Sequence, residues 1–162
     1  MRKVLFLVRH AATKLTSDSG RDFDRTLKEE GHQEAIKLGH YLKQQGLTFQ
    51  QIVASPAKRT KTTVLLIAEQ LGYDIHKIVW NEQLYNASVG TVMGIVNQLD
   101  ERLEQVMIVG HNPSITYTSE YLTERKIQHV PTCGFVHINF WHLAWAKIAK
   151  GMGELALFKS TL

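Results

Sequence analysis

The feature that most constrains this fold is a short apolar run, Val4 to Val8, that ends directly at the polar pair Arg9 and His10. A continuous run of this length, rich in valine and leucine, is typical of a strand that is buried on both faces of a sheet. The sequence therefore predicts a sheet built from several such strands. Comparable runs recur at residues 52–54, 78–80, 106–109, 135–140 and 155–158.

The segments between the middle runs carry apolar residues at helical spacing. Residues 35–42 follow the i, i+3, i+4, i+7 pattern, and the same pattern extends over 60–71 and 92–103. Asn112 followed by Pro113 is typical of a helix N-cap with proline at the first helical position, so a fourth helix is expected there. Strands that alternate with helices predict an α/β fold, a three-layer α/β/α sandwich with a mostly parallel central sheet. The sequence leaves open the direction of the last two strands.

Length and composition restrict the class of protein. The chain has 162 residues, 44% of them hydrophobic, which suits a single domain over residues 1–162. The lone cysteine, Cys133, cannot form an intrachain disulfide or a cysteine-rich metal site, and this favours a cytoplasmic protein. The N-terminal apolar run is too short for a signal peptide, and no segment is expected to cross a membrane. The net charge of +4 favours anionic partners, but the basic residues are dispersed, so neither nucleic acid nor a membrane is an expected partner.

Three of the predicted strands end at basic or histidine side chains. Arg9 and His10 follow the first strand, Ser55 and Arg59 follow the second, and His111 follows the fourth. Ligands of open α/β sheets bind beyond the carboxyl ends of the strands, so we expect these residues to converge. Arginine forks and helix N-termini both bind phosphate oxygens, which makes a phosphoryl group the expected anion.

His10 is the expected nucleophile of such a site. A phosphatase without metal ligands or a reactive cysteine needs another attacking group, and a neutral imidazole nitrogen is nucleophilic near pH 7. The neighbouring cations would spread the charge of the transition state, so no metal or other cofactor is expected.

Ser55 and Asn112 each have two possible roles. Ser55 is expected to cap the helix that carries Arg59, with a phosphate contact as the alternative, whereas Asn112 could cap the fourth helix or donate to a phosphoryl oxygen.

These motifs resemble those of the histidine phosphatase superfamily. The residues that carry the resemblance are Leu7-Val8-Arg9-His10, Ser55-Pro56 with Arg59, and Val109-Gly110-His111-Asn112. The short chain and the segments at 24–27, 84–88 and 131–134 are similar to the small SixA-type phosphohistidine phosphatases. The resemblance implies a phosphoglycerate mutase-like fold, His10 as nucleophile, and Arg9, Arg59 and His111 as phosphoryl ligands. Ala11 stands where the family usually carries glycine.

The proton donor is the least defined part of the predicted site. Larger members of the superfamily use a glutamate after the third strand, and Glu82 is its nearest counterpart here, with Asp18, Asp22 and Asp24 after His10 as alternatives. Phosphohistidine needs less acid catalysis than a phosphate ester, because its imidazole leaves as a neutral ring once the other ring nitrogen is protonated. We therefore expect hydrolysis of phosphohistidine on a protein. A metal-independent phosphomonoesterase for a small metabolite or sugar phosphate and a non-catalytic phosphate-binding module are the alternatives.

Overall fold

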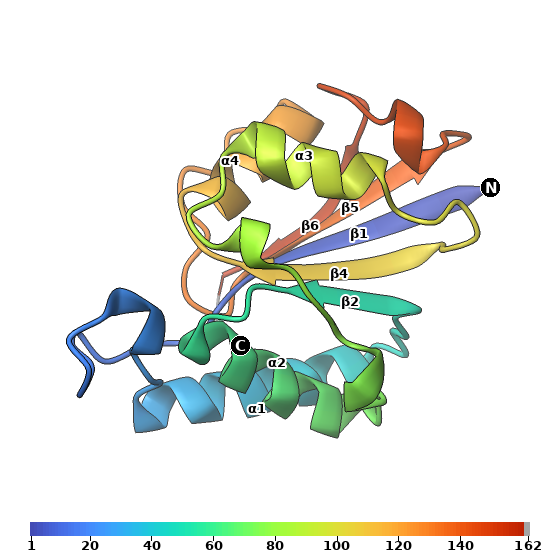
Figure 1. Ribbon diagram of the computed structural model, residues 1–162. Coiled ribbons are helices and arrows are strands. Elements are labelled where there is room, and N and C mark those ends of the chain that lie inside the picture. The colour runs from blue at the N-terminus through green and yellow to red at the C-terminus, as the bar shows by residue number, and fades with distance from the viewer. Residues whose placement is uncertain (161–162) are drawn as a thin grey trace.

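The computed structural model describes residues 1–160, which form a six-stranded sheet between two layers of helices (Figure 1). Helices α1 and α2 cover one face of the sheet, and α3 and α4 cover the other, so the predicted α/β/α sandwich is confirmed. The strands are β1 (Arg2–Arg9), β2 (Gln51–Ala54), β3 (Val79–Trp80), β4 (Gln105–Gly110), β5 (Phe135–Trp141) and β6 (Glu154–Lys159). The helices are α1 (Glu29–Gln44), α2 (Lys58–Leu71), α3 (Val89–Asn97) and α4 (Ser114–Thr123). Within residues 1–160, no helix is long and apolar enough to span a membrane.

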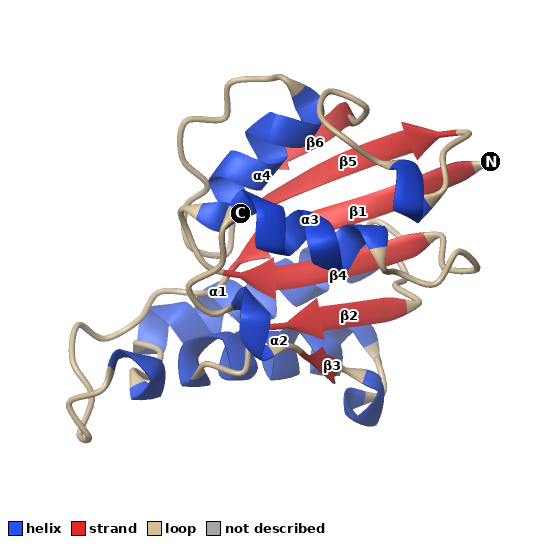
Figure 2. Cartoon of the chain, turned by 45° about the horizontal axis from the view of Figure 1, so that its top comes forward, coloured by secondary structure: helices blue, strands red, loops and turns tan. Residues whose placement is uncertain are grey.

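The strands are arranged in the order β3-β2-β4-β1-β5-β6 (Figure 2). β1, β2, β3 and β4 run parallel to one another. β5 runs antiparallel to β1, and β6 runs antiparallel to β5. The sheet is therefore mostly parallel, as predicted, and β5 alone among these strands opposes the common direction.

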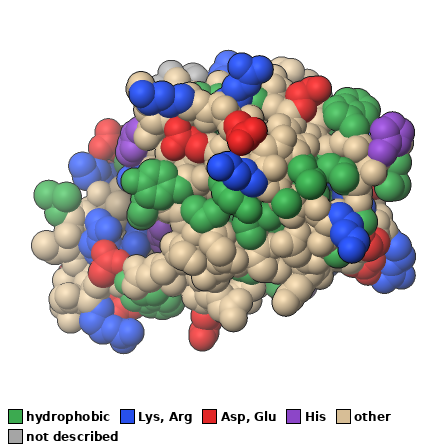
Figure 3. Space-filling model, turned by 90° about the horizontal axis from the view of Figure 1, so that it is seen from above, with side chains coloured by type: hydrophobic (Ala, Val, Ile, Leu, Met, Phe, Trp, Pro, Cys, Tyr) green, Lys and Arg blue, Asp and Glu red, His purple; other side chains and the backbone are tan. Residues whose placement is uncertain are grey.

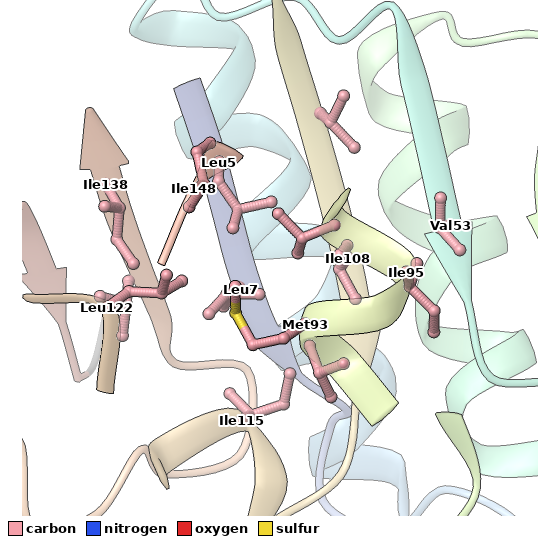
Figure 4. Packing of buried hydrophobic residues seen from close by; sticks show 14 of the residues in the cluster. Leu5, Leu7, Val53, Met93, Ile95, Ile108, Ile115, Leu122, Ile138 and Ile148 are labelled. Atoms are coloured by element: carbon pink, nitrogen blue, oxygen red, sulfur yellow. The ribbon is translucent and has the colours of Figure 1, made fainter. Parts of the chain in front are cut away.

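Each face of the sheet has its own apolar core, because side chains alternate between the faces along a buried strand. Leu5 and Leu7 of β1 lie on the side of α3 and α4, where Met93 and Ile115 pack near them (Figure 4). Phe6 lies on the opposite face, in the core beneath α1 and α2. The continuous apolar run at the N-terminus is thus explained by burial on both sides.

Two helix boundaries differ from the predictions. The apolar pattern predicted a helix through residue 103, but α3 ends at Asn97. The Asp100 side chain accepts a hydrogen bond from the backbone N–H of Arg102, which favours a turn over a further helical turn. The predicted cap at the fourth helix was wrong by one position. Pro113, after a cis peptide bond, is the residue that precedes α4, and the helix begins at Ser114.

Short 3-10 segments complete the described elements. They are η1 (Asp22–Asp24), η2 (Ile75–Lys77), η3 (Glu82–Leu84) and η4 (Trp145–Lys147).

Candidate active site

The register of the strands places the predicted site residues side by side. Arg9, at the end of β1, pairs with Gly110, at the end of β4. The backbone N–H of His10 then donates to the Gly110 carbonyl at 3.1 Å. On the other side of β4, the N–H of Ser55 donates to the Val109 carbonyl at 3.1 Å. The segments that follow β1, β2 and β4 therefore leave the sheet at the same edge.

A hollow with two lobes of about 430 and 450 Å³ lies beyond this edge. Viewed from the side of α3 and α4, Lys, Arg and His side chains gather around a recess at the left end of the molecule (Figure 3). The structure brings all four residues of the predicted phosphoryl site into this hollow. The residues shared by both lobes are Arg25, Arg59, His111 and Asn112, and Arg9 and His10 line the smaller lobe.

His10 is buried, with 5% of its surface exposed, and its ring orientation is fixed by a backbone contact. Its Nδ1 lies 2.8 Å from the carbonyl oxygen of Ala11. A carbonyl oxygen can only accept, so Nδ1 carries the proton and donates it. In the neutral ring, Nε2 is then the nitrogen with the free lone pair. This tautomer is the one that a nucleophilic histidine needs.

Both histidines are held neutral by their surroundings. Burial, together with the charges of the nearby cations Arg59, Arg9 and Arg25, lowers the pKa of His10 to about 4. Burial, followed by the proximity of His10 and Arg59, lowers the pKa of His111 to about 3. The two rings lie close together, with centroids 5.2 Å apart. At neutral pH the two imidazoles are therefore uncharged, and the cations around them favour this state.

Arg9 and Arg59 each present a donor that has no partner in the described part of the chain. The Nε atoms of Arg9 and Arg59 are buried and have no hydrogen-bond partner in residues 1–160. One terminal nitrogen of Arg9 donates to the Val130 carbonyl at 3.3 Å and lies 3.3 Å from Nε2 of His129. A guanidinium whose buried Nε–H has no partner favours an anion in the hollow, because an unpaired buried donor costs free energy.

Asp22 is the carboxylate closest to this cationic site. Its Oδ2 lies 3.1 Å from Arg59 and accepts a 2.6 Å hydrogen bond from the hydroxyl of Tyr85. Arg25 donates to Oδ1 at 2.9 Å, and Arg59 also donates to the Asp22 carbonyl at 2.8 Å. The hydrogen bond from Tyr85 and the charge of Arg59 lower the pKa of Asp22 to about 2. Asp22 is thus an ionised group that holds two arginines at the hollow.

The other carboxylates considered from the sequence lie elsewhere. Glu82 is exposed at the start of η3 and does not line either lobe. Asp18 and Asp24 border a separate hollow, and Asp24 accepts a hydrogen bond from Ser19 at 2.7 Å. Of the four predicted acid candidates, the structure brings Asp22 alone to the hollow. In the part of the chain that is described, no three His, Cys, Asp or Glu side chains are grouped in a way that could hold a metal ion.

Ser55 does not cap α2, and the expectation that it would do so was wrong. The helix α2 begins at Lys58, so the residue at its N-cap position is Ala57 and not Ser55. The methyl side chain of Ala57 cannot accept a capping hydrogen bond. The Ser55 hydroxyl instead lies 2.7 Å from Nε2 of His111 and accepts the N–H of Ala57 at 3.3 Å. Its position at the end of β2 places it against the neighbouring β4 segment rather than at the helix terminus.

Asn112 uses both ends of its amide within the protein. Its Oδ1 accepts hydrogen bonds from the backbone N–H and the hydroxyl of Thr116, at 3.3 and 2.8 Å. Its Nδ2 donates to the Val130 carbonyl at 2.7 Å. Asn112 therefore ties the first turn of α4 to the segment before β5, and one amide N–H remains for a ligand in the hollow.

Ala11 and Glu34 shape the backbone that follows His10. Ala11 is fully buried, its N–H donates to the Thr63 hydroxyl at 3.0 Å, and its φ is not positive, so alanine is accommodated without strain. Glu34 of α1 accepts the N–H of Ala12 at 2.7 Å and the hydroxyl of Thr132 at 2.9 Å. Glu34 thereby joins the two segments on either side of the smaller lobe.

Comparison with known proteins agrees with this geometry. The model of the histidine phosphatase superfamily, branch 1, matches residues 5–107 of the chain. The chain belongs to the histidine phosphatase superfamily. An uncharacterized protein of Mycobacterium tuberculosis is similar to this histidine phosphatase, with 28% identity over 162 residues, 93% of this chain and 98% of that protein. A broad-specificity phosphatase of Saccharomyces cerevisiae is 27% identical over 93 residues, which are 56% of this chain and 40% of the yeast protein.

Solved structures share the fold of this histidine phosphatase over its whole length. The candidate phosphohistidine phosphatase SixA from Nakamurella multipartitia superposes with a TM-score of 0.84 at 25% identity, covering 100% of this chain and 98% of that one. The candidate SixA from Agrobacterium tumefaciens has a TM-score of 0.82 at 26% identity, with 96% of each chain covered. The phosphoglycerate mutase-like fold and the similarity to SixA proteins are thus confirmed.

Proposed function

We propose that this histidine phosphatase removes the phosphoryl group from phosphohistidine on a protein, by way of a covalent phosphohistidine intermediate on His10. The observation that carries the proposal is the charge state of the one carboxyl group that lines the hollow in residues 1–160. That group is Asp22, and its pKa of about 2 leaves it ionised at neutral pH. An ionised carboxylate cannot protonate an alkoxide leaving group, whereas an imidazole protonated on its other nitrogen leaves as a neutral ring without such a donor.

In the first step of the proposed reaction, the substrate phosphoryl group binds between Arg9 and Arg59, where the free guanidinium donors match its oxygens. The Nε2 lone pair of His10 attacks phosphorus as the P–N bond to the substrate imidazole breaks. The bonding pair returns to the substrate ring, which leaves neutral. One P–N bond replaces another, and the arginines stabilise the charge that spreads over the phosphoryl oxygens.

In the second step, water attacks the phosphorus of phospho-His10. The new bond is P–O, and the bond that breaks is the one between phosphorus and Nε2. The bonding pair returns to Nε2, so His10 leaves as the neutral ring with its proton still on Nδ1. The attacking water passes a proton to a phosphoryl oxygen, and inorganic phosphate is released. The low pKa of His10, about 4, makes this ring a better leaving group than an ordinary histidine.

The exposed rim of the hollow supports a protein as the substrate. Leu15, which borders the smaller lobe, is 86% exposed. Lys28, another residue of this lobe, also has an exposed side chain. A phosphorylated side chain carried on a protein surface can approach such a rim, whereas enzymes for small phosphate esters often enclose their substrate under a closing loop.

A small phosphate ester is the second candidate substrate. The larger lobe, of about 450 Å³, extends past the phosphoryl site to Asn86, Ala87 and Pro113 and has space for a small organic group. The Tyr85 hydroxyl beside this lobe is bonded to Asp22 and could pass a proton to an ester oxygen after rearrangement. The name of the yeast relative, a broad-specificity phosphatase, agrees with this second candidate.

The decisive experiment compares a phosphohistidine-bearing protein with a panel of alkyl phosphates, using the parent, His10→Ala and His40→Ala. His40 is exposed on α1 and serves as the matched control. We expect His10→Ala to lose at least about a thousandfold in turnover while His40→Ala is unchanged. Mass spectrometry at alkaline pH should trap phosphate on His10 of the parent. Faster turnover of alkyl phosphates than of phosphohistidine would favour a small phosphate ester as the substrate. Phosphate binding without any intermediate would favour a non-catalytic phosphate-binding module.

A further inference from the structure

Two buried hydroxyl groups lie beside His111. The Oγ of Ser55, a residue with no exposed surface, is 2.7 Å from Nε2 of this ring. The Oγ1 of Thr60, in the first turns of α2, is 3.4 Å from the same nitrogen and is equally buried. Nε2 of His111 is therefore in contact with hydroxyl groups of the protein, whereas Nδ1 has no partner in the described residues.

The hydrogen-bond pattern determines which nitrogen carries the proton. The Ser55 oxygen already accepts the N–H of Ala57, so its own proton needs an acceptor. Within residues 1–160, Nε2 of His111 is the acceptor in reach of the Ser55 hydroxyl and of the Thr60 hydroxyl. Nε2 has one lone pair, and the shorter of its two contacts is the one with Ser55. If Nε2 carried the proton, the buried Ser55 hydroxyl proton would lose its acceptor, at about 1–3 kcal/mol. The satisfied arrangement has Ser55 donating to Nε2 and the proton of the ring on Nδ1.

We propose that Ser55 is a positioning residue that holds His111 as its Nδ1–H tautomer, so that the ring donates a neutral hydrogen bond to the phosphoryl group. The inference rests on the proposed function for the identity of the acceptor. Nδ1 is buried and has no partner in the described residues, although His111 lines both lobes of the hollow. A buried N–H in this position calls for an acceptor, and a phosphoryl oxygen supplies one.

Loss of the Ser55 hydroxyl should change what the ring presents to the substrate. Without it, the proton is free to move to Nε2, and Nδ1 would then direct a lone pair toward negatively charged oxygens. Removal of one preorganised donor from an enzyme site lowers kcat by about 100-fold to 1000-fold. Because the two tautomers are both accessible in the variant, we expect Ser55→Ala to lower kcat by about 10-fold to 100-fold, with a smaller effect on KM.

The experiment measures the tautomer directly, by ¹⁵N NMR of the parent protein with labelled histidine at neutral pH. The His111 signals are assigned by their loss in His111→Asn. We expect a protonated Nδ1 and an unprotonated Nε2 in the parent, and a population with the proton on Nε2 in Ser55→Ala. A parent ring with its proton on Nε2 would overturn the inference, even if the variant did not fold.

The matched control is Ser119→Ala, which removes an equally buried hydroxyl that, among the described residues, bonds only to the Ile115 carbonyl in α4. This control should leave the His111 spectrum and kcat as in the parent, and Ser55→Thr, which keeps a hydroxyl, should restore the Nδ1–H signal. An active parent whose Ser55→Ala variant keeps both the tautomer and kcat would refute the role of Ser55. A parent with the expected tautomer but no phosphatase activity would instead refute the proposed function and leave the assignment of the tautomer intact.

Discussion

Acid should destabilise this protein through His10 and His111, the two histidines of the candidate active site. In the folded chain the pKa values are about 4 for His10 and about 3 for His111. An unfolded histidine titrates near 6.5. The folded state therefore favours the neutral rings, and this contribution is fully present above about pH 6.5 and is lost as the pH falls toward the folded values. Linkage gives a loss of about 2 kcal/mol for each ring between about pH 7.5 and pH 5, or about 4 kcal/mol for the pair.

Urea unfolding at these two pH values measures the loss, since the linear extrapolation gives the free energy of unfolding in water. His10→Asn should lose about 2 kcal/mol less than the parent on acidification, because one depressed histidine is gone. His40→Asn, at an exposed position of α1, should follow the parent. If the parent and His10→Asn lost the same stability, the burial of an uncharged His10 among cations would not be the source of the pH dependence, and the reasoning would be wrong.

Two further substitutions test the surroundings of the phosphoryl site. Asp22→Asn removes a negative charge 3.1 Å from Arg59, so inorganic phosphate should inhibit about fivefold more tightly, as measured by competitive inhibition constants; weaker inhibition would show that Asp22 acts chiefly by orienting Arg59. Glu34→Ala leaves the N–H of Ala12 and the hydroxyl of Thr132 without their acceptors and should cost about 2 kcal/mol in urea unfolding. Glu34→Gln keeps one acceptor oxygen and should cost less than Glu34→Ala, and equal losses would contradict the role of these hydrogen bonds.

The central part of the site could be predicted from the sequence because it follows from topology. Parallel strands end at one edge of a sheet, so residues such as Arg9 and His111 must meet there, whatever the details of the loops. The register between β1 and β4 then confirms that the two strands end at the same level. Hydrophobic periodicity predicts which segments are helices and which are strands, because it reflects which side chains are buried. It does not fix the exact ends of a helix or strand.

The parts that could not be predicted depend on loop geometry. Arg25 and Tyr85 belong to the segments at 24–27 and 84–88, for which the sequence predicts no role. Both contact Asp22, Arg25 from three positions away and Tyr85 from more than sixty. No periodic pattern encodes such a contact. The sequence favours the more common capping role for Ser55, because the approach of Ser55 to His111 follows only from the pairing of β2 with β4.

In the proposed reaction, the cations around His10 have a second role besides binding phosphate. Arg59 and Arg9 lower the pKa of His10, but this adds little to the neutral fraction, since an ordinary histidine is already about three-quarters neutral at pH 7. A less basic ring is in fact a weaker nucleophile, so the first step gains mainly from positioning and from stabilisation of the phosphoryl charge. The benefit falls on the second step, in which the same ring must leave from phosphorus. An exchange between two imidazoles can tolerate a less basic nucleophile, because no strong P–O bond is broken in the first step, and this balance favours phosphohistidine over a phosphate ester as the substrate.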